Sequence, residues 1–444
     1  MVLGAFFEAF VVIGLLGGGT IINRDTASKF AADNSSRWNS PRAASPAPRA
    51  RKYYDAEEAA RPDEETVALG SWARDADQPT AAAGYDSGSE AISDPTKRQR
   101  TLRLWKWRRT VETPNTEVFK DRILSRLLRK FPFLVEAWYW ALIYWVYQLG
   151  RAFTAIYIID ESVVDVARRH ALQVLHVEQS LHLFVELPIQ QYFLEKPFLM
   201  HWINRIYSFI HIPGTILFLI VLYYVTTTRP AQQLNKAQTS GVSPTRWRSV
   251  MSNFHPQLYE RRRRTMAMCN LMAFIIFTAW PCMPPRLLSD AHLVGGSSDA
   301  QEALGYGFVD TVHSATGESS VWTTNKFCNQ YAAMPSLHFG YSLLIGLTIA
   351  TIPLGTQNRY CLKRSLVALG AMIYPAIILT AIVATANHFV LDAVAGALVC
   401  AVAWHTNGFL LNLLPLEDYF LWAVRIHKPS KISLHNNSKV SFRI

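Results

Sequence analysis

The sequence has little charge and few cysteines for its length. Charged residues make up 17% of its 444 residues, against about a quarter in ordinary soluble domains. The five cysteines are too few for a disulfide framework, and no Cys or His cluster has the spacing of a zinc site. The composition therefore excludes a coiled coil, a mainly disordered chain and a small disulfide scaffold.

What the chain has in excess is apolar residues, unevenly distributed. Hydrophobic residues make up 50% and aromatic residues 12%, yet the mean hydropathy is only +0.09. These values indicate a polar part averaged with a very apolar part. The net charge of +11 fits three kinds of partner or role: nucleic acid, an anionic membrane surface, or cytosolic loops.

The N-terminal region divides into an apolar and a polar stretch. Residues 1–22 are apolar except for Glu8, and the first basic residue, Arg24, follows them. A cleaved signal peptide is one interpretation, but the position of Arg24 favours a signal anchor with its C-terminal side in the cytosol. Residues 23–131 are polar, and we expect them to be largely disordered. Their basic end, 97–130, we interpret as cytosolic and lipid-facing rather than as a nucleic-acid site.

Six long apolar segments follow, and most reach the roughly 20 residues that a membrane-spanning helix needs. The sequence therefore predicts an all-α, polytopic membrane helical bundle with six core transmembrane helices, in addition to the N-terminal anchor. We assign residues 132–414 to this membrane domain and 415–444 to a basic cytosolic tail. The six segments lie at about 133–159, 202–227, 266–283, 337–353, 366–386 and 389–413.

The loops alternate in charge, as a six-span topology requires. Residues 228–264 are strongly basic, whereas residues 160–200 and 287–335 are rich in acids. By the positive-inside rule, the two acidic loops face away from the cytosol. Residues 160–200 are also amphipathic, which predicts one or two helices at the membrane interface.

Two unusual motifs lie at the extracytosolic ends of the third and fourth segments. In Pro284-Pro285-Arg286, the prolines stop a helix, and the arginine either snorkels to lipid phosphates or binds a substrate phosphate. The second motif, Ala333-Met334-Pro335-Ser336-Leu337-His338, begins a helix. Ser336 is an ordinary helix cap, but a helix N-terminus also attracts anions, and a protonatable His338 beside it suits acid catalysis.

The third motif begins the last segment, on the same side of the membrane. It reads Asn387-His388-Phe389-Val390-Leu391-Asp392. His388 and Asp392 are four residues apart and share a helix face. An aspartate can hold an imidazole in one tautomer and leave its other nitrogen free to attack. A single such pair is unsurprising in a chain with 13 histidines, but an aspartate inside an apolar span favours a functional role.

The order of these motifs resembles the type-2 phosphatidic acid phosphatase superfamily. It is most similar to the branch of fungal inositol-phosphorylceramide synthase and related inositolphosphotransferases. The resemblance covers about residues 133–413 and implies a role for each matching residue. His388 corresponds to a phosphoryl-accepting nucleophile, Asp392 to its orienting partner and His338 to the acid for the leaving oxygen. Ser336 and Arg286 correspond to phosphate-binding groups, and the resemblance implies no metal and no other cofactor.

The chain departs from the broad superfamily at its cations. Ala279 stands where the superfamily has a lysine, and Ala381-Ile382 stand where it has Ser-Arg. Leu337 replaces a glycine of the second motif, and Leu287 replaces a proline after Arg286. A site with fewer cations suits a monoanionic diester better than a dianionic monoester.

These departures lead to a hypothesis about the reaction. The donor is a phospholipid diester, with inositol phosphate as one candidate head group, and the acceptor is a lipid hydroxyl such as that of ceramide. A lipid phosphate phosphatase and a non-enzymatic scaffold or transporter remain alternatives. Three further residues are secondary candidates, either supplying missing charge and hydrogen bonds or serving structural roles: Lys326, His211 and Asn387.

The resemblance and the apolar segments also indicate the partners and the cellular location of the protein. The expected partners are membrane lipids and the bilayer, without nucleic acid. The resemblance implies an endomembrane location such as the Golgi, with the active site facing the lumen. Cys282 and Cys328 both fall on that side, where they either form a disulfide or remain free thiols.

Overall fold

The structure is a computed structural model in which the chain forms two compact units. Met1–Ala27 and Phe131–Asn407 form the first unit, and Ser28–Lys130 and Gly408–Ile444 form the second. We call them the helical unit and the hairpin unit. The structure describes residues 2–26, 96–104, 106–157, 161–233, 256–290, 298–312, 330–352 and 362–429.

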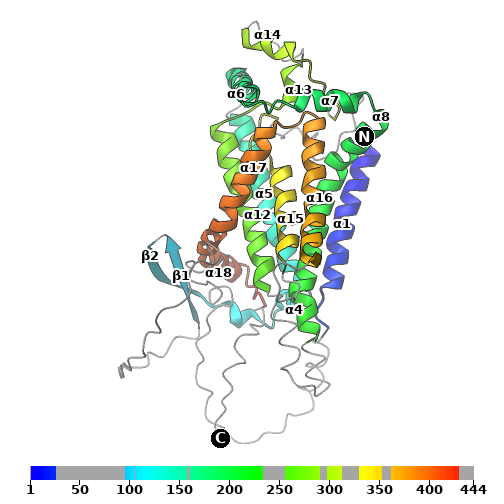
Figure 1. Cartoon of the computed structure of the whole chain (residues 1–444). Helices are drawn as coiled ribbons and strands as arrows, with labels where there is room; N and C mark the ends of the chain where they lie inside the picture. Colours follow the sequence, from blue (N-terminus) through cyan, green and yellow to red (C-terminus); the bar gives the residue numbers. More distant parts are fainter. Residues whose placement is uncertain are drawn as a thin grey trace, which may run out of the picture. The chain divides into compact units, whose positions relative to one another are not determined.

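The helical unit is a bundle of roughly aligned helices with further helices across one end (Figure 1). The aligned helices are α1 (Val2–Ile22), α5 (Phe133–Tyr157), α9 (His211–Tyr223), α12 (Pro256–Ala279), α15 (Leu337–Thr351), α16 (Leu362–Ala384) and α17 (Val390–Thr406). The helices at one end of the bundle are α6 (Glu161–Ser180), α7 (Glu186–Leu194), α8 (Pro197–Arg205), α13 (Pro285–Leu288) and α14 (Ser298–Gly305). The π-helical turn η3 (Ile206–Ile210) directly precedes α9, and the π-helical turn η4 (Tyr224–Thr228) directly follows it.

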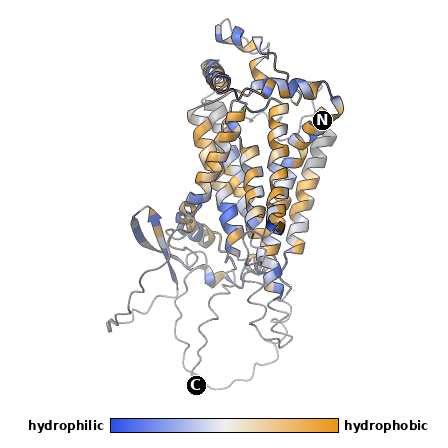
Figure 2. Ribbon diagram, viewed as in Figure 1, coloured by the Kyte–Doolittle hydropathy of each residue, from blue (hydrophilic) through white to orange (hydrophobic). Residues whose placement is uncertain are grey.

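Each of the six predicted segments coincides largely with a helix of this bundle. Among the residues that the structure describes, three helices are long and apolar enough to cross a membrane: Pro197–Gln233, Leu362–Ala384 and Val390–Ala423. Figure 2 shows the apolar residues concentrated along the long helices. Glu136 interrupts the apolar pattern of α5. Its side chain is buried, and its Oε2 accepts a hydrogen bond from Nη1 of Arg263 at 3.0 Å, so the buried acid has a partner. The chain is mostly helical, which agrees with a helical membrane protein.

Helix α6 packs against the motifs through its apolar face. Ala167, Ala171 and Leu175 are buried in one cluster with Met283 and Phe389. The amphipathic pattern of this segment therefore serves to cover the end of the bundle where the motifs meet.

The hairpin unit contains strands and helices at the end of the polar N-terminal region. Strands β1 (Lys97–Leu104) and β2 (Trp107–Pro114) form an antiparallel hairpin within the stretch that we expected to be largely disordered. The unit also contains η2 (Thr116–Phe119), α4 (Ile123–Lys130) and α18 (Leu414–Ala423), while η6 (Asn407–Leu413) begins at the last residue of the helical unit.

The hairpin is stabilised by hydrogen bonds to a residue that is distant in the sequence. Asp418 of α18 is buried and accepts hydrogen bonds from Nε and Nη2 of Arg100, at 2.8 and 2.9 Å. Its Oδ2 also accepts from the hydroxyl of Thr113 at 2.7 Å. Because these contacts join the polar N-terminal region to the C-terminal tail, local composition does not reveal them.

Candidate functional site

The three motifs meet through backbone hydrogen bonds at one end of the bundle. The N–H of Arg286 donates to the carbonyl oxygen of Ala386 at 2.8 Å, which joins the first motif to the third. The N–H of Ser336 donates to the carbonyl oxygen of Asp392 at 2.9 Å, which joins the second to the third. The N–H of Ala333 donates to the carbonyl oxygen of Cys282 at 3.1 Å, which joins the second motif to the residues just before the first. The relative position of the motifs is thus set by main-chain contacts.

The imidazole of His388 is held from one side. Its Nδ1 lies 2.8 Å from the carbonyl oxygen of Ala333 and 3.5 Å from Oδ2 of Asp392. A carbonyl oxygen can only accept, so Nδ1 carries the hydrogen in the neutral ring and Nε2 carries the lone pair. Nε2 has no hydrogen-bond partner among the residues that the structure describes. This arrangement leaves a nucleophilic nitrogen.

Asp392 also holds the start of the helix on which it lies. Its Oδ2 accepts from the N–H of Phe389 at 2.9 Å, and its side chain is fully buried. Two further acids bind the same turn. Oε1 of Glu186 accepts from the N–H of Val390, and Oε1 of Glu178 accepts from the N–H of Leu391, each at 2.7 Å. Three carboxyl groups therefore satisfy the N-terminus of α17.

These acids affect one another. Burial first, and then the neighbouring Glu186, raise the pKa of Glu178 to about 9. Glu178 therefore carries a proton at neutral pH, which reduces the repulsion within the cluster. Neither glutamate was a candidate from sequence, since each appears there as one acid in an amphipathic helix. A fully buried acid facing a motif becomes recognisable only in the fold.

Arg286 is positioned by two side chains. Its Nε donates to Oδ1 of Asn387 at 2.9 Å, and its Nη1 donates to Oδ2 of Asp310 at 2.8 Å. The side chain of Arg286 is 5% exposed. Asn387, a secondary candidate, thus contacts Arg286 directly. Asp310 was not predicted, because it is one of several acids in a long polar loop.

Ser336 is the N-cap of α15. Its Oγ accepts a long hydrogen bond of 3.4 Å from the N–H of Phe339. The hydroxyl hydrogen is still free to be donated, because a hydroxyl group can accept and donate at once. A helix N-terminus can bind an anion through its first-turn N–H groups, which here are those of Leu337 and His338.

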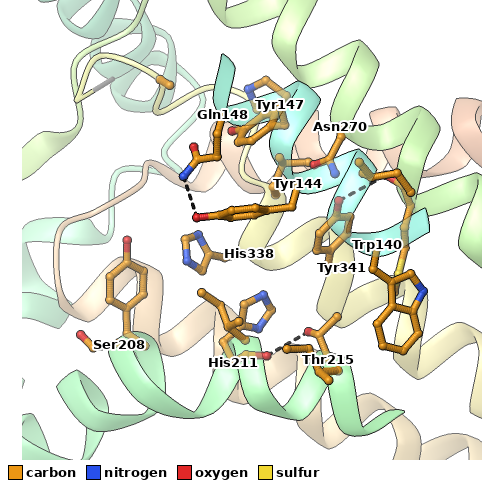
Figure 3. A pocket seen from close by; sticks show the side chains of 18 of the residues that line it. Trp140, Tyr144, Tyr147, Gln148, Ser208, His211, Thr215, Asn270, His338 and Tyr341 are labelled. Atoms are coloured by element: carbon orange, nitrogen blue, oxygen red, sulfur yellow. Dashed lines mark hydrogen bonds between the residues drawn. The ribbon is translucent and has the colours of Figure 1, made fainter. Parts of the chain in front are cut away.

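His338 lies in a row of rings. Its centroid is 5.1 Å from that of His211 and 5.8 Å from that of His388. It stacks on Tyr207 at 4.7 Å. The hydroxyl of Tyr374 is 2.9 Å from Nδ1 of His211. His211, another secondary candidate, is therefore next to His338, and Figure 3 shows both rings among the side chains of the pocket.

Several of these groups line one cavity of about 630 Å³. Arg286, Asn387 and His388 line it at the motif end, together with His338 and His211. Most of the remaining wall is apolar or aromatic. The arrangement can hold a phosphate group at one end and an apolar chain beyond it.

Two candidates lie outside the described residues, namely Lys326 and Cys328. Cys282 is a buried free thiol whose Sγ donates to the carbonyl oxygen of Met283 at 3.8 Å. This does not favour the disulfide alternative. Among the described residues, no group of three or more His, Cys, Asp or Glu side chains is arranged to hold a metal ion, and metal independence stays a prediction.

Comparison with known families adds to this geometry. The pattern of the PAP2 superfamily matches residues 172–242 and 247–406, which is more than half of the chain. The chain belongs to the PAP2 superfamily. The match includes α12 and α15–α17, which carry or flank all three motifs, whereas α1 and α5 lie outside it.

PAP2 membership confirms the broader part of the resemblance and leaves the branch within the superfamily as a proposal. PAP2 proteins are typically phosphatases or phosphotransferases acting on lipid phosphates. Together with the candidate membrane spans, this fits an integral membrane protein. Comparison with curated proteins and with solved structures gives no match.

Proposed function

We propose that this PAP2 protein is a metal-independent lipid phosphotransferase that works through a phosphohistidine at His388. The observation that carries the proposal is the hydrogen bond between Nδ1 of His388 and the carbonyl oxygen of Ala333. It directs the lone pair of Nε2 away from the backbone, in a ring that lines the cavity. Asp392, 3.5 Å from Nδ1, stabilises the positive charge that the ring gains on attack.

The first half of the reaction transfers the phospho-head group to the enzyme. Nε2 of His388 attacks phosphorus, and the bond from phosphorus to the oxygen of the lipid alcohol breaks. His338 protonates that oxygen as it leaves. Arg286 and the start of α15 hold the phosphate oxygens.

The second half releases the product. The hydroxyl of the acceptor attacks phosphorus, its proton passes to His338, and the bond from phosphorus to Nε2 breaks. With a phosphomonoester as donor and water as acceptor, the same two steps would release inorganic phosphate, which is the phosphatase reaction and the second candidate function.

The charge around Arg286 favours a diester donor. Asp310 lies 2.8 Å from its Nη1 and offsets the charge of the phosphate-binding cation. A monoanionic diester is therefore better matched than a dianionic monoester. From the resemblance, we propose inositol phosphate as the head group, ceramide as the acceptor, and a Golgi or other endomembrane location with the site facing the lumen.

The test uses the full-length protein in lipid nanodiscs. Phosphatidylinositol labelled in its head group is supplied with ceramide, and labelled phosphatidic acid is supplied in parallel. His388→Ala is the test variant, and His405→Ala, a change of an exposed histidine in the last turn of α17, is the matched control.

A labelled sphingolipid made by wild type and by His405→Ala, but not by His388→Ala, supports the transferase. Release of phosphate from phosphatidic acid without transfer would favour the phosphatase and overturn the transferase. No turnover of either lipid would overturn both. An acid-labile phosphoenzyme that is lost in His388→Ala would support the covalent step.

A further inference from the structure

The cavity extends far beyond the reacting groups. Phe277 and Arg263, both on α12, line it, and their separation of fourteen residue steps corresponds to about 21 Å of helix. The hydrocarbon core of a bilayer is about 30 Å thick. The cavity therefore has the depth of a lipid chain rather than of a head group.

One wall of this cavity comes from α1. Val12 and Leu16 line it, and their spacing of four places them on one face of the helix. Ile13, on another face, is 69% exposed. The helix thus presents one face to the cavity and another away from the bundle.

Helix α1 is fixed to the bundle close to this wall. A Cβ atom on Gly19 would lie 3.0 Å from both Ile220 and Phe133, so α1 packs closely there. The hydroxyl of Thr228 donates to Oδ1 of Asn23 at 2.6 Å, and Asn23 is 1% exposed. A loosely held membrane anchor would not need a buried polar contact of this kind.

We infer that α1 forms part of a lipid-chain binding site and that Leu16 limits the length of the alkyl chain that reaches the catalytic end. This inference rests on the proposed function, because it assigns the apolar part of the same substrate. It goes beyond the family relationship, since α1 lies outside the matched residues. It also gives residues 1–22 a role in selectivity rather than in targeting alone.

The test compares two substitutions on α1 in the full-length protein in nanodiscs. Leu16→Trp fills the cavity, and Ile13→Trp adds the same side chain on the exposed face as a matched control. Leu16→Ala, which enlarges the cavity, is the second test variant. Turnover is measured for a series of phospholipids that differ only in chain length.

We expect Leu16→Trp to lower kcat/KM for the longest chains roughly tenfold and to leave the shortest nearly unchanged, because a few methylene groups in an apolar pocket are worth this much. Leu16→Ala should shift the preference toward longer chains, and Ile13→Trp should leave the profile as in wild type. Identical profiles for Leu16→Trp and Ile13→Trp would overturn the inference, whereas absence of lipid turnover in wild type would overturn the proposed function.

A second measurement does not depend on turnover. A phospholipid with a photoreactive group at the end of its chain is irradiated with the protein, and labelled peptides are identified by mass spectrometry. We expect labelling at Leu16 that an unlabelled lipid of the same chain length displaces. Labelling confined to Ile13 and other outward residues would mean that the chain does not enter the cavity.

Discussion

The carbonyl oxygen of Ala333 is closer to Nδ1 of His388 than the carboxylate of Asp392 is, at 2.8 Å against 3.5 Å. The backbone of the second motif therefore orients the histidine of the third. No side-chain substitution removes a carbonyl group, so the tautomer of His388 is protected against most mutations. Asp392 is left with an electrostatic role and with the cap of α17.

This division of roles predicts the effect of Asp392→Asn. Where an aspartate alone fixes the tautomer of a catalytic histidine, the change to asparagine costs about 10⁴ in kcat. Here Ala333 still holds the ring, so we expect a loss on the order of 100-fold. The amide oxygen can still accept from Phe389, so thermal unfolding should change little. Turnover close to wild type, or a loss as large as 10⁴, would contradict this assignment.

A second prediction concerns the contact between α17 and the start of α15. A Cβ atom on Gly396 would lie 2.3 Å from the carbonyl oxygen of Ser336. Because both groups are on the main chain, Gly396→Ala should displace the start of α15, lower the free energy of unfolding by about 1–3 kcal/mol and abolish turnover. Gly370→Ala is the control, since nothing lies within 4 Å of a Cβ atom there. Equal activity and thermal stability in the two variants would show that this contact is not critical.

A third prediction follows from the raised pKa of Glu178. The folded state keeps its proton up to a pKa of about 9, against 4.5 for an ordinary glutamate. The folded protein thus binds more protons than the unfolded chain between these values, so this group makes stability fall as pH rises from about 4.5 to 9. Glutamine in its place keeps an acceptor for the N–H of Leu391 and removes the titration.

The measurement is the thermal unfolding of wild type and Glu178→Gln at several pH values. We expect the variant to gain stability relative to wild type as pH increases from 5 to 9, because the unfolded wild-type chain releases the proton of residue 178 in this range while the folded protein retains it. A difference that stays constant with pH would mean that Glu178 does not titrate in this range.

The fourth prediction concerns the ion pair of Arg286. Asp310→Asn removes the negative charge beside the guanidinium and keeps a hydrogen-bond acceptor. We expect hydrolysis of a phosphomonoester to rise relative to transfer from a diester, by about tenfold for one charge at this distance. Asp299→Asn, a change of an acid in α14 that is 40% exposed, is the control. An unchanged ratio of the two rates would remove Asp310 as a determinant of donor charge.

Much of the site could be located from the sequence, because its motifs are local. The spacing of His388 and Asp392, the prolines before Arg286 and the cap at Ser336 each lie within a few residues. The topology inferred from loop charge placed them on one side, and in the fold Arg286, His338 and His388 line one cavity. Their catalytic roles stay predictions.

The groups that hold these residues could not be predicted in the same way. The partner of His388 is a backbone carbonyl group, which any residue at position 333 would provide. Asp310 and Glu178 are ordinary acids until the fold brings them against Arg286 and the start of α17. The hairpin could not be predicted from the local sequence, because the buried partner of Arg100 is Asp418, which is 318 residues away.

The contact between Arg100 and Asp418 predicts the effect of truncating the protein at its C-terminus. A premature stop just after residue 413 would leave the three motifs and their helices intact. It would also remove the carboxylate that binds Arg100 and Thr113 inside the hairpin unit. Removing the acid of a buried ion pair lowers the free energy of unfolding by about 3–5 kcal/mol. Loss of the short C-terminal tail should therefore act on the polar N-terminal region, at the opposite end of the reading frame.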